Sequence, residues 1–532
     1  MAEEPTAPFA TRHAVHGMVC SVDHLASEAG ISVLRAGGTA ADAAVATSAV
    51  LAVTTQHMCG MGGDLFAVVH HQQGAPVVLN ASGRAGSGAD PDRLLAEGVT
   101  AMPLRGDIRS VPVPGCVDGW LALHERFGRL PLADVLAPAI VAAEDGFPAS
   151  PTLAASVPMV AGLPGADDYT DPGTVRPGTV VRRPGVARAL RDIVRGGRAA
   201  WYEGEFGEGL LALGAAGDGR PEYEPGDLSV PGADWVDALG LRAFGHDLWT
   251  VPPNSQGYLT LSSAWIAEDL DLPGDPADPR WAHLLVEAAR HAGHDRLAAL
   301  HEHADGAALL DLDGLARRRA AIDGERASTL GGEGRDGGTI HLATVDIDRM
   351  GVSLIQSNAS GWGAHLVVPG VRVFLQDRGI GFSLEAGHPA RYGPGRRPPH
   401  TLAPALVTDP AGRLRTVVGT MGGDQQPQIL LQLLVRSLHA GESPGRAISA
   451  GRFALAGPTG FTTWDRGGAV TVKVEGNAPG SWLPGLVDRG HLAEAAEAWS
   501  HLFGHAHLIT VEDDHLAGAS DPRPRTGAAT GW

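Results

Sequence analysis

A threonine hydroxyl stands where the chain changes from a glycine-rich run to a strand-like segment. Residues 331–338 read GGEGRDGG, which is too rich in glycine for regular structure, and Thr339 opens the alternating segment TIHLATVD, which is typical of a strand. A threonine hydroxyl becomes nucleophilic when a base takes its proton, and cleavage after Gly338 would free an α-amine with a pKa of about 7.7–8.0. The sequence therefore predicts that Thr339 supplies both the nucleophile and the base.

The segments on either side of the turn at residues 347–351, TIHLATVD and VSLIQSN, are expected to pair as a hairpin. If Asp346 lies opposite Val352, Thr339 lies opposite Ala359, give or take one residue. The polar side chains that this register brings within reach of the threonine are Ser357, Asn358 and Ser360.

A second glycine pair could stabilise the oxyanion that such a nucleophile produces. Gly422 and Gly423 occur in VVGTMGGDQQPQ, at the end of an expected strand and just before a helical run, where backbone N–H groups can converge. A plain strand-to-helix turn explains the same residues equally well. The motif lacks the GK[ST] of a phosphate loop, and the chain has no GxSxG elbow.

The composition excludes several classes of function. The formal net charge of -19 opposes binding to nucleic acids or anionic membranes, because such binding needs clustered Lys and Arg. Lys473 is the only lysine, so a Walker lysine or a Schiff-base lysine is nearly excluded. The high counts of glycine (73) and proline (38) predict a protein rich in loops.

The cysteines indicate neither a disulfide framework nor a structural zinc site, because Cys20, Cys59 and Cys116 are odd in number and widely spaced. The sequence also shows no signal-peptide pattern and no run of 18 apolar residues. We therefore expect a cytoplasmic protein without metal or cofactor, whose partners are a small-molecule substrate and possibly further copies of itself.

Hydrophobic periodicity predicts alternating helices and strands, which is consistent with a layered α/β sandwich. The loop CGMGGD is interpreted as packing glycines rather than a nucleotide loop, and residues 160–240 as a surface excursion of the same domain. The expected elements are a strand at 17–23 and helices at 24–36, 40–53, 115–127 and 131–147.

A histidine-rich segment at 281–303 leaves two interpretations open. The spacing of His283, Glu287 and His291 could bind a metal, but an amphipathic helix is the favoured interpretation because no HExxH motif is present.

Six blocks along the chain resemble the γ-glutamyltranspeptidase family of N-terminal nucleophile hydrolases, in the family's order. They are GMVCSVDHLASEAGISVLRAGGTAADAAVA, CGMGGDLF, PVPGCVDGW, GGTIHLATVD, GTMGGD and LAGASDPRPRTGAATGW. The resemblance implies a four-layer αββα sandwich, made as a precursor that cuts itself into a large part, 1–338, and a small part, 339–532.

The resemblance also implies roles for single residues. Thr339 would first attack the carbonyl of Gly338 and later be acylated by substrate. Ser357 falls where the family has an assisting threonine, and Asn358 lies beside the family's asparagine position. Gly422 and Gly423 match the oxyanion glycines.

The departures from the family pattern fall on the residues that hold a glutamyl head group. The family's carboxylate-binding arginine falls on Ser82, and Arg84, two residues further on and on the same side of a strand, is the expected substitute. The family's aspartate for the substrate amino group falls near Ile380, and its serine pair becomes His400 and Thr401. An isoleucine would leave a substrate ammonium unpaired.

The expected function is therefore a self-processing amidohydrolase acting through an acyl-Thr339 intermediate on a small acyl group, possibly one that bears a carboxylate. A true γ-glutamyl transferase or glutathione hydrolase is the close alternative. The alternative from another class is an uncleaved, non-catalytic homologue that serves in binding.

Overall fold

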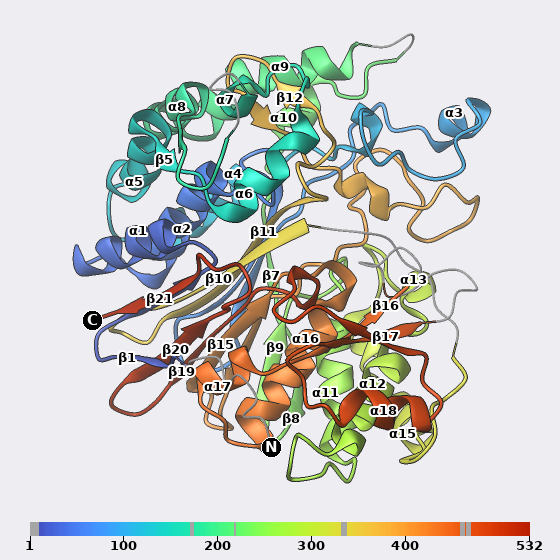
Figure 1. The fold of residues 1–532 in the computed structure, drawn as a ribbon. Helices are drawn as coiled ribbons and strands as arrows, with labels where there is room; N and C mark the ends of the chain where they lie inside the picture. Colours follow the sequence, from blue (N-terminus) through green and yellow to red (C-terminus); the bar gives the residue numbers. More distant parts are fainter. Residues whose placement is uncertain (1–9, 171–174, 217–219, 331–337, 458–462, 464–469) are drawn as a thin grey trace.

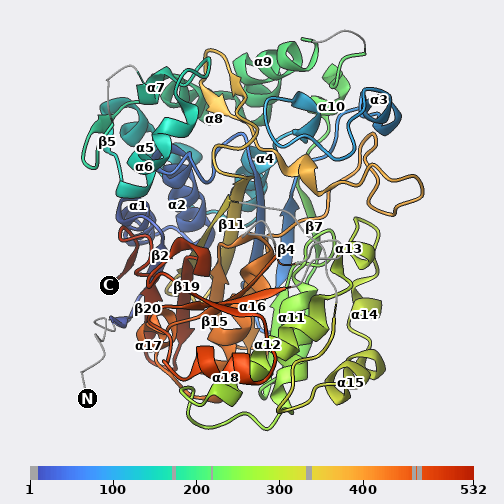
Figure 2. The ribbon, with the colours of Figure 1, turned by 45° about the vertical axis from the view of Figure 1, so that its right-hand side comes forward.

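The computed structural model describes residues 10–170, 175–216, 220–330, 338–457, 463 and 470–532, and it shows two stacked sheets enclosed by helices (Figures 1 and 2). The glycine run at 331–337 lies outside the described residues. Helices cover the outer face of each sheet, so the layers follow the order helix, sheet, sheet, helix. The expected αββα sandwich is confirmed.

Each sheet has seven strands, and each takes strands from both sides of Thr339. The first sheet has the order β21 (Ala528–Gly531), β2 (Met18–Ser21), β10 (Gly338–Val345), β11 (Gly351–Ala359), β3 (Asp64–His70), β4 (Val77–Ala81) and β7 (Asp234–Asp237). The second has the order β1 (Arg12–Ala14), β20 (Leu516–Ser520), β19 (Ala506–Val511), β15 (Leu414–Thr420), β14 (Ala405–Thr408), β9 (His246–Thr250) and β8 (Leu239–Ala243).

The helices form two outer layers. On the first sheet lie α1 (His24–Arg35), α2 (Ala40–Thr54) and α4 (Cys116–Phe127), with α5 (Leu132–Asp145) and α8 (Pro184–Tyr202) packed against them and α9 (Glu205–Gly214) packed against α8. On the second lie α11 (Tyr258–Glu268), α16 (Gln426–Leu434) and α17 (Pro444–Ser449), with α12 (Pro279–Gly293), α15 (Leu312–Ala320) and α18 (Trp482–Asp488) outside them. The helices expected near the N-terminus are thus confirmed, with boundaries shifted by a few residues at most.

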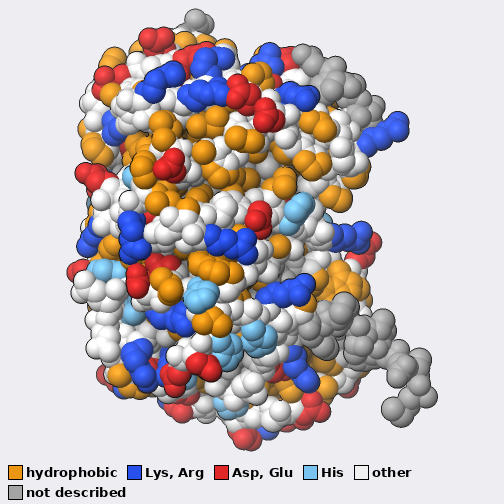
Figure 3. All heavy atoms as spheres, turned by 90° about the vertical axis from the view of Figure 1, so that its left-hand side faces the viewer, with side chains coloured by type: hydrophobic (Ala, Val, Ile, Leu, Met, Phe, Trp, Pro, Cys, Tyr) orange, Lys and Arg blue, Asp and Glu red, His pale blue; other side chains and the backbone are white. Residues whose placement is uncertain are grey.

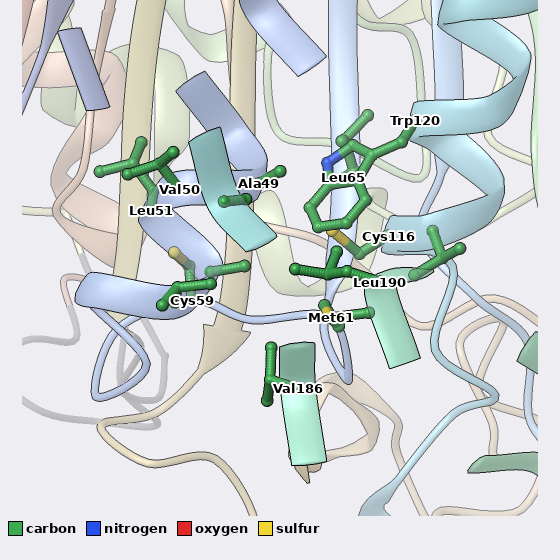
Figure 4. Packing of buried hydrophobic residues seen from close by; sticks show 14 of the residues in the cluster. Ala49, Val50, Leu51, Cys59, Met61, Leu65, Cys116, Trp120, Val186 and Leu190 are labelled. Carbon is green, nitrogen blue, oxygen red and sulfur yellow. The ribbon is translucent and has the colours of Figure 1, made fainter. Parts of the chain in front are cut away.

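Three apolar cores lie between the four layers. One lies between the first sheet and its helices, one between the second sheet and its helices, and one between the two sheets. Figure 4 shows part of the first core, where Cys59 and Cys116 lie among apolar side chains that include Leu65 and Trp120. The three cysteines are free and buried, and burial raises the pKa of the Cys59 thiol to about 12, which keeps it protonated and unreactive.

The hairpin formed by β10 and β11 differs in register from the expected one. Val352 pairs with Thr344 rather than with Asp346, because the turn is tighter than predicted. The carboxylate of Asp346 accepts hydrogen bonds from the N–H groups of Asp348 and Met350, both at 3.0 Å. These bonds hold a turn that is shorter than the one predicted at 347–351.

The segment at 160–240 is more than a surface excursion. It supplies α8 and α9 to the outer layer, and Trp201, Tyr202 and Tyr223 are almost completely buried in the first core. Tyr202 also donates a hydrogen bond to the carbonyl of Pro114 at 2.6 Å. The prediction was wrong because the glycine and proline content masked two amphipathic helices.

The histidine-rich segment forms the helix α12, which ends at Gly293, so that His301 and His303 lie beyond it. The histidines of α12 form hydrogen bonds with other side chains of the protein. His283 Nδ1 lies 2.7 Å from His491 Nε2, and His291 Nε2 lies 2.8 Å from the hydroxyl of Ser328. Among the described residues, no three His, Cys, Asp or Glu side chains form a group that could hold a metal ion.

The face of the molecule in Figure 3 carries acidic, basic, histidine and apolar side chains that are intermixed. Among the residues described by the structure, no helix is both long enough and apolar enough to span a membrane.

Candidate active site

The strand β11 contains a β-bulge opposite the predicted nucleophile. Gly338 pairs with Ala359 and Ile340 pairs with Gln356, so Thr339 alone opposes two residues of β11. These two residues are Ser357 and Asn358. A bulge of this kind redirects side chains locally and is common beside active sites.

Thr339 and Ser357 form a buried pair of hydroxyls. Their Oγ1 and Oγ atoms are 3.1 Å apart, and neither side chain is exposed to solvent. Ser357 Oγ also accepts the N–H of Ala359 at 2.8 Å and a guanidinium N–H of Arg378 at 3.0 Å. These donors fix the position of Ser357 Oγ and favour negative charge on it, which suits a group that assists a nucleophile.

Asn358 is held by the loop that follows α2. Its backbone N–H donates to the carbonyl of Met58 at 3.1 Å, and its Nδ2 donates to the carbonyl of Gln56 at 2.9 Å. Its Oδ1 is buried and has no hydrogen-bond partner among the described residues. This oxygen can therefore accept a hydrogen bond from a group that enters the site.

Ser360 was expected near Thr339, and the structure joins it to a different group. Its backbone N–H donates to Asp377 Oδ1 at 2.8 Å, while the N–H of Asp377 donates to the carbonyl of Asn358 at 3.1 Å. Burial raises the pKa of Asp377 to about 6. The difference in hairpin register and the positive φ of Ala359 (71°) redirect the chain before it reaches Ser360.

Gly62 and Gly63 of CGMGGD allow the loop before β3 to approach two other segments closely. A Cβ added to Gly62 would lie 2.2 Å from the carbonyl oxygen of Phe374, and one added to Gly63 would lie 2.1 Å from that of Ser357. Both distances are too short for any side chain. Their role as packing glycines is confirmed, and Gly63 packs directly against the backbone of Ser357.

Arg378 lies at the centre of the site and was not predicted. It begins the short helix η3 (Arg378–Gly381) and its side chain is almost completely buried. Its Nε lies 3.3 Å from Asp64 Oδ2, its Nη1 lies 3.2 Å from Thr401 Oγ1, and its Nη2 donates to Ser357. Asp64 is the first residue of β3 and pairs in register with Ser357.

His400 is bound to protein groups through both ring nitrogens. Its Nδ1 accepts the N–H of Leu402 at 3.2 Å, which places the ring proton on Nε2, and Nε2 lies 2.6 Å from Asp64 Oδ2. Burial and the neighbouring Arg378 guanidinium lower the pKa of His400 to about 4. A neutral His400 thus orients Asp64, which in turn holds Arg378.

Gly422 and Gly423 follow the end of β15, where Gly422 caps η4 (Gly423–Gln425) and Gly423 begins it, just before α16. Their φ angles of 139° and 56° lie in the region that favours glycine. Gln256 links them to the site, because its Nε2 donates to the carbonyls of Gly423 and Thr401, both at 3.0 Å. The N-terminal position on a helix and two consecutive N–H groups suit the stabilisation of an oxyanion.

The residues at the expected head-group positions, Arg84, Ser82 and Ile380, do not form one cluster of contacts in the described part of the chain. Arg84 donates to Glu302 at 2.6 Å and to Asp234 at 3.2 Å, and its side chain is 35% exposed, so the structure places it in surface ion pairs. Ser82 donates to Asn80 at 2.7 Å. Ile380 is buried in η3, two residues after Arg378.

A second pair of buried side chains lies on the Thr339 face of β10. His341 Nδ1 and His507 Nδ1 are 3.2 Å apart, and His341 Nε2 lies 3.0 Å from the hydroxyl of Ser353. Burial lowers the pKa of His507 to about 4. These contacts join the nucleophile strand to β19 of the second sheet.

The sequence and the fold are similar to those of known proteins along nearly their whole length. The sequence profile described as gamma-glutamyltranspeptidase matches residues 26–531. The chain is 35% identical over 530 residues to the "glutathione hydrolase-like YwrD proenzyme" of Bacillus subtilis (strain 168), covering 97% of this chain and 98% of that protein. It is 34% identical over 533 residues to the "oxamate amidohydrolase proenzyme" of Klebsiella pneumoniae, with the same coverage.

Among solved structures, the cephalosporin acylase from Bacillus halodurans superposes with a TM-score of 0.89 and 31% sequence identity, over 100% of this chain and 99% of that one. These similarities are to hydrolases and an acylase, so they favour an enzyme over the alternative of a non-catalytic binding protein. The chain belongs to the γ-glutamyltranspeptidase family and is an enzyme of the N-terminal nucleophile amidohydrolase type.

Proposed function

We propose that the chain cuts itself between Gly338 and Thr339 and then hydrolyses an amide of a small, carboxylate-bearing acyl group. The observation that carries this proposal is the buried hydroxyl pair, in which Thr339 Oγ1 lies 3.1 Å from Ser357 Oγ at a β-bulge. Several relatives are named as proenzymes, which supports a cleavage step.

Cleavage would leave the two pieces, 1–338 and 339–532, associated. In the first sheet, β10 and β11 lie between β2 and β3, and in the second sheet β14 pairs with β9. Separating the pieces would therefore break central strand pairs in the first sheet and expose the apolar core between the sheets. The α-amine of Thr339, once freed, lies on the same residue as the hydroxyl that it activates.

The reaction follows from these positions. Thr339 Oγ1 attacks the amide carbonyl carbon and its proton passes to the α-amine, which then protonates the leaving amine. The N–H groups of Gly422 and Gly423 stabilise the oxyanion, and Ser357 orients the attacking hydroxyl. Water then attacks the acyl ester, so that the acid leaves and the threonine hydroxyl is restored.

The choice of acyl group rests on the head-group positions. Ile380 offers no charge to a substrate ammonium, and Ser82 is engaged with Asn80. An α-amino acid head group would leave its ammonium unpaired there, which costs more than the loss of one hydrogen bond. The relatives' names include an oxamate amidohydrolase and a glutathione hydrolase-like protein, so both kinds of substrate are included in the test.

The test has two parts. Denaturing electrophoresis should show two bands, with Thr339 at the N-terminus of the smaller one. Steady-state rates of the cleaved protein should be higher with oxamate-type and glutaryl amides than with a γ-glutamyl anilide. A single full-length band, or a strong preference for the γ-glutamyl compound, would contradict the proposal.

A cytoplasmic location and a homo-oligomeric state remain predictions. The free, buried cysteines are compatible with a reducing compartment. Cell fractionation and light scattering of the purified protein test the two predictions separately.

A further inference from the structure

The guanidinium of Arg378 lies close to the reacting oxygen. Its Nη2 is 3.0 Å from Ser357 Oγ, which is itself 3.1 Å from Thr339 Oγ1, so Nη2 lies within about 6 Å of the nucleophile. Arg84, in contrast, is paired with Glu302 and Asp234.

Arg378 has donor capacity beyond its protein contacts. A guanidinium has five N–H donors, and Asp64, Thr401 and Ser357 receive one each among the described residues. Asp64 contacts the Nε side, so Nη1 and Nη2 each carry a second hydrogen. The planar guanidinium can bridge two carboxylates, which allows Asp64 to stay in place when a second anion binds.

The short distance limits the length of the acyl group. In an acyl-Thr339 ester, a carboxylate bonded directly to the carbonyl carbon has its oxygens about 3 Å from Oγ1, from ordinary bond lengths. Adding a charge-assisted hydrogen bond of about 2.8 Å reaches a donor about 6 Å from Oγ1. Each further methylene moves the carboxylate about 1.3 Å away, so a longer acyl chain would have to fold back.

We propose that Arg378 binds the substrate carboxylate, and that the preferred substrate is an amide whose carboxylate is bonded directly to the scissile carbonyl. This inference rests on the proposed amidohydrolase function and narrows its substrate class to monoamides of oxalic acid. Asp64 and His400 contribute to carboxylate binding indirectly, because they hold the guanidinium of Arg378 in position.

The first test uses the unmodified, self-cleaved enzyme and a series of amides of increasing length. Ammonia release is measured with oxamate, malonamate, succinamate and glutaramate. We expect kcat/KM to be highest for oxamate and to fall about 10- to 100-fold on the first lengthening, the range for loss of one charge-assisted hydrogen bond. A preference for succinamate or glutaramate would overturn the inference and leave the amidohydrolase function standing. No ammonia release from any amide by the cleaved enzyme would overturn both.

The second test separates carboxylate binding from positioning of Ser357. In 2-oxopropanamide an acetyl group replaces the carboxylate, so the compound is uncharged and nearly the same size as oxamate. Arg378→Gln should lower kcat/KM for oxamate about 10- to 100-fold more than for 2-oxopropanamide, and Arg378→Lys should restore part of the difference. Equal losses on both compounds would show that Arg378 acts only through Ser357 and would overturn the inference.

Two further variants complete the comparison. Arg242→Gln removes an exposed guanidinium that is paired with Asp247, and it should change neither rate. A selective loss of oxamate hydrolysis in Arg84→Gln, with Arg378→Gln unaffected, would assign the carboxylate to Arg84 and overturn the inference. If Arg378→Gln does not cut itself, the length series on the unmodified enzyme decides alone.

Discussion

Substitution of Gly63 by alanine should disable the site without touching any reacting group. The added Cβ would lie 2.1 Å from the carbonyl oxygen of Ser357 and 2.9 Å from Asn358 Oδ1. An ordinary contact needs at least about 3 Å, so β11 must retreat by about 1 Å at the bulge. A displacement of that size costs about 100-fold in rate, and overpacking costs about 1–3 kcal/mol of stability.

The assay compares two neighbouring glycines with clashes of equal severity. In Gly62→Ala the new Cβ would lie 2.2 Å from the carbonyl oxygen of Phe374, so stability should fall similarly while Ser357 is displaced less. Gly274→Ala is the neutral control, because a Cβ there meets nothing within 4 Å. Self-cleavage rate, kcat/KM and the urea midpoint are measured for each variant. Self-cleavage and kcat/KM within twofold of the unmodified protein in Gly63→Ala would refute the reasoning.

Three further predictions concern charges and the nucleophile. Thr339→Ala should abolish both self-cleavage and hydrolysis, seen as a single electrophoretic band and no ammonia release; hydrolysis by the uncut variant would contradict the assignment. Asp64→Asn should lower the free energy of unfolding by about 3–5 kcal/mol in urea titrations, because it leaves a buried guanidinium without its carboxylate; a loss below about 1 kcal/mol would contradict this. Stability should also fall as the pH drops from about 6.5 towards 4, because His400 and His507 have folded-state pKa values of about 4 and the unfolded chain takes up the protons first. Each histidine contributes up to about 3 kcal/mol by pH 4, while Asp377, with its pKa raised to about 6, partly offsets the fall; urea titrations across this range that show constant stability would refute the assignment.

The features that could be predicted from the sequence are those set by neighbouring residues. Alternation of apolar residues predicts β10, the helical spacing of Leu25, Ala29 and Val33 predicts α1, and the run of small residues at 40–53 is interpreted as the helix α2. The packing role of Gly62 and Gly63 follows from their type alone, because a loop without the spacing of a phosphate site needs glycine for close approach. These predictions are confirmed in the structure.

The charged part of the site could not be predicted, because three distant segments form it. Asp64 begins β3, Arg378 begins η3, and His400 lies in a loop before β14. The one signal in the sequence is the charged pair in LQDRGIG, which lies within an apolar stretch and suggests burial. No feature of the sequence around Arg378 indicates that its side chain faces Ser357.

The hairpin register shows why Ser357 was nevertheless predicted correctly as a neighbour of Thr339. The observed pairing of Thr344 with Val352 differs by two residues from the predicted one. A strand repeats its faces every two residues, so an error of two keeps Ser357 on the face of Thr339, whereas an error of one would have turned it towards the helices. The bulge then sets two residues of β11 against Thr339, and Arg378 approaches from the η3 loop to donate to one of them. The nucleophile's partner is therefore determined by strand periodicity, while the charge beside it depends on the tertiary fold.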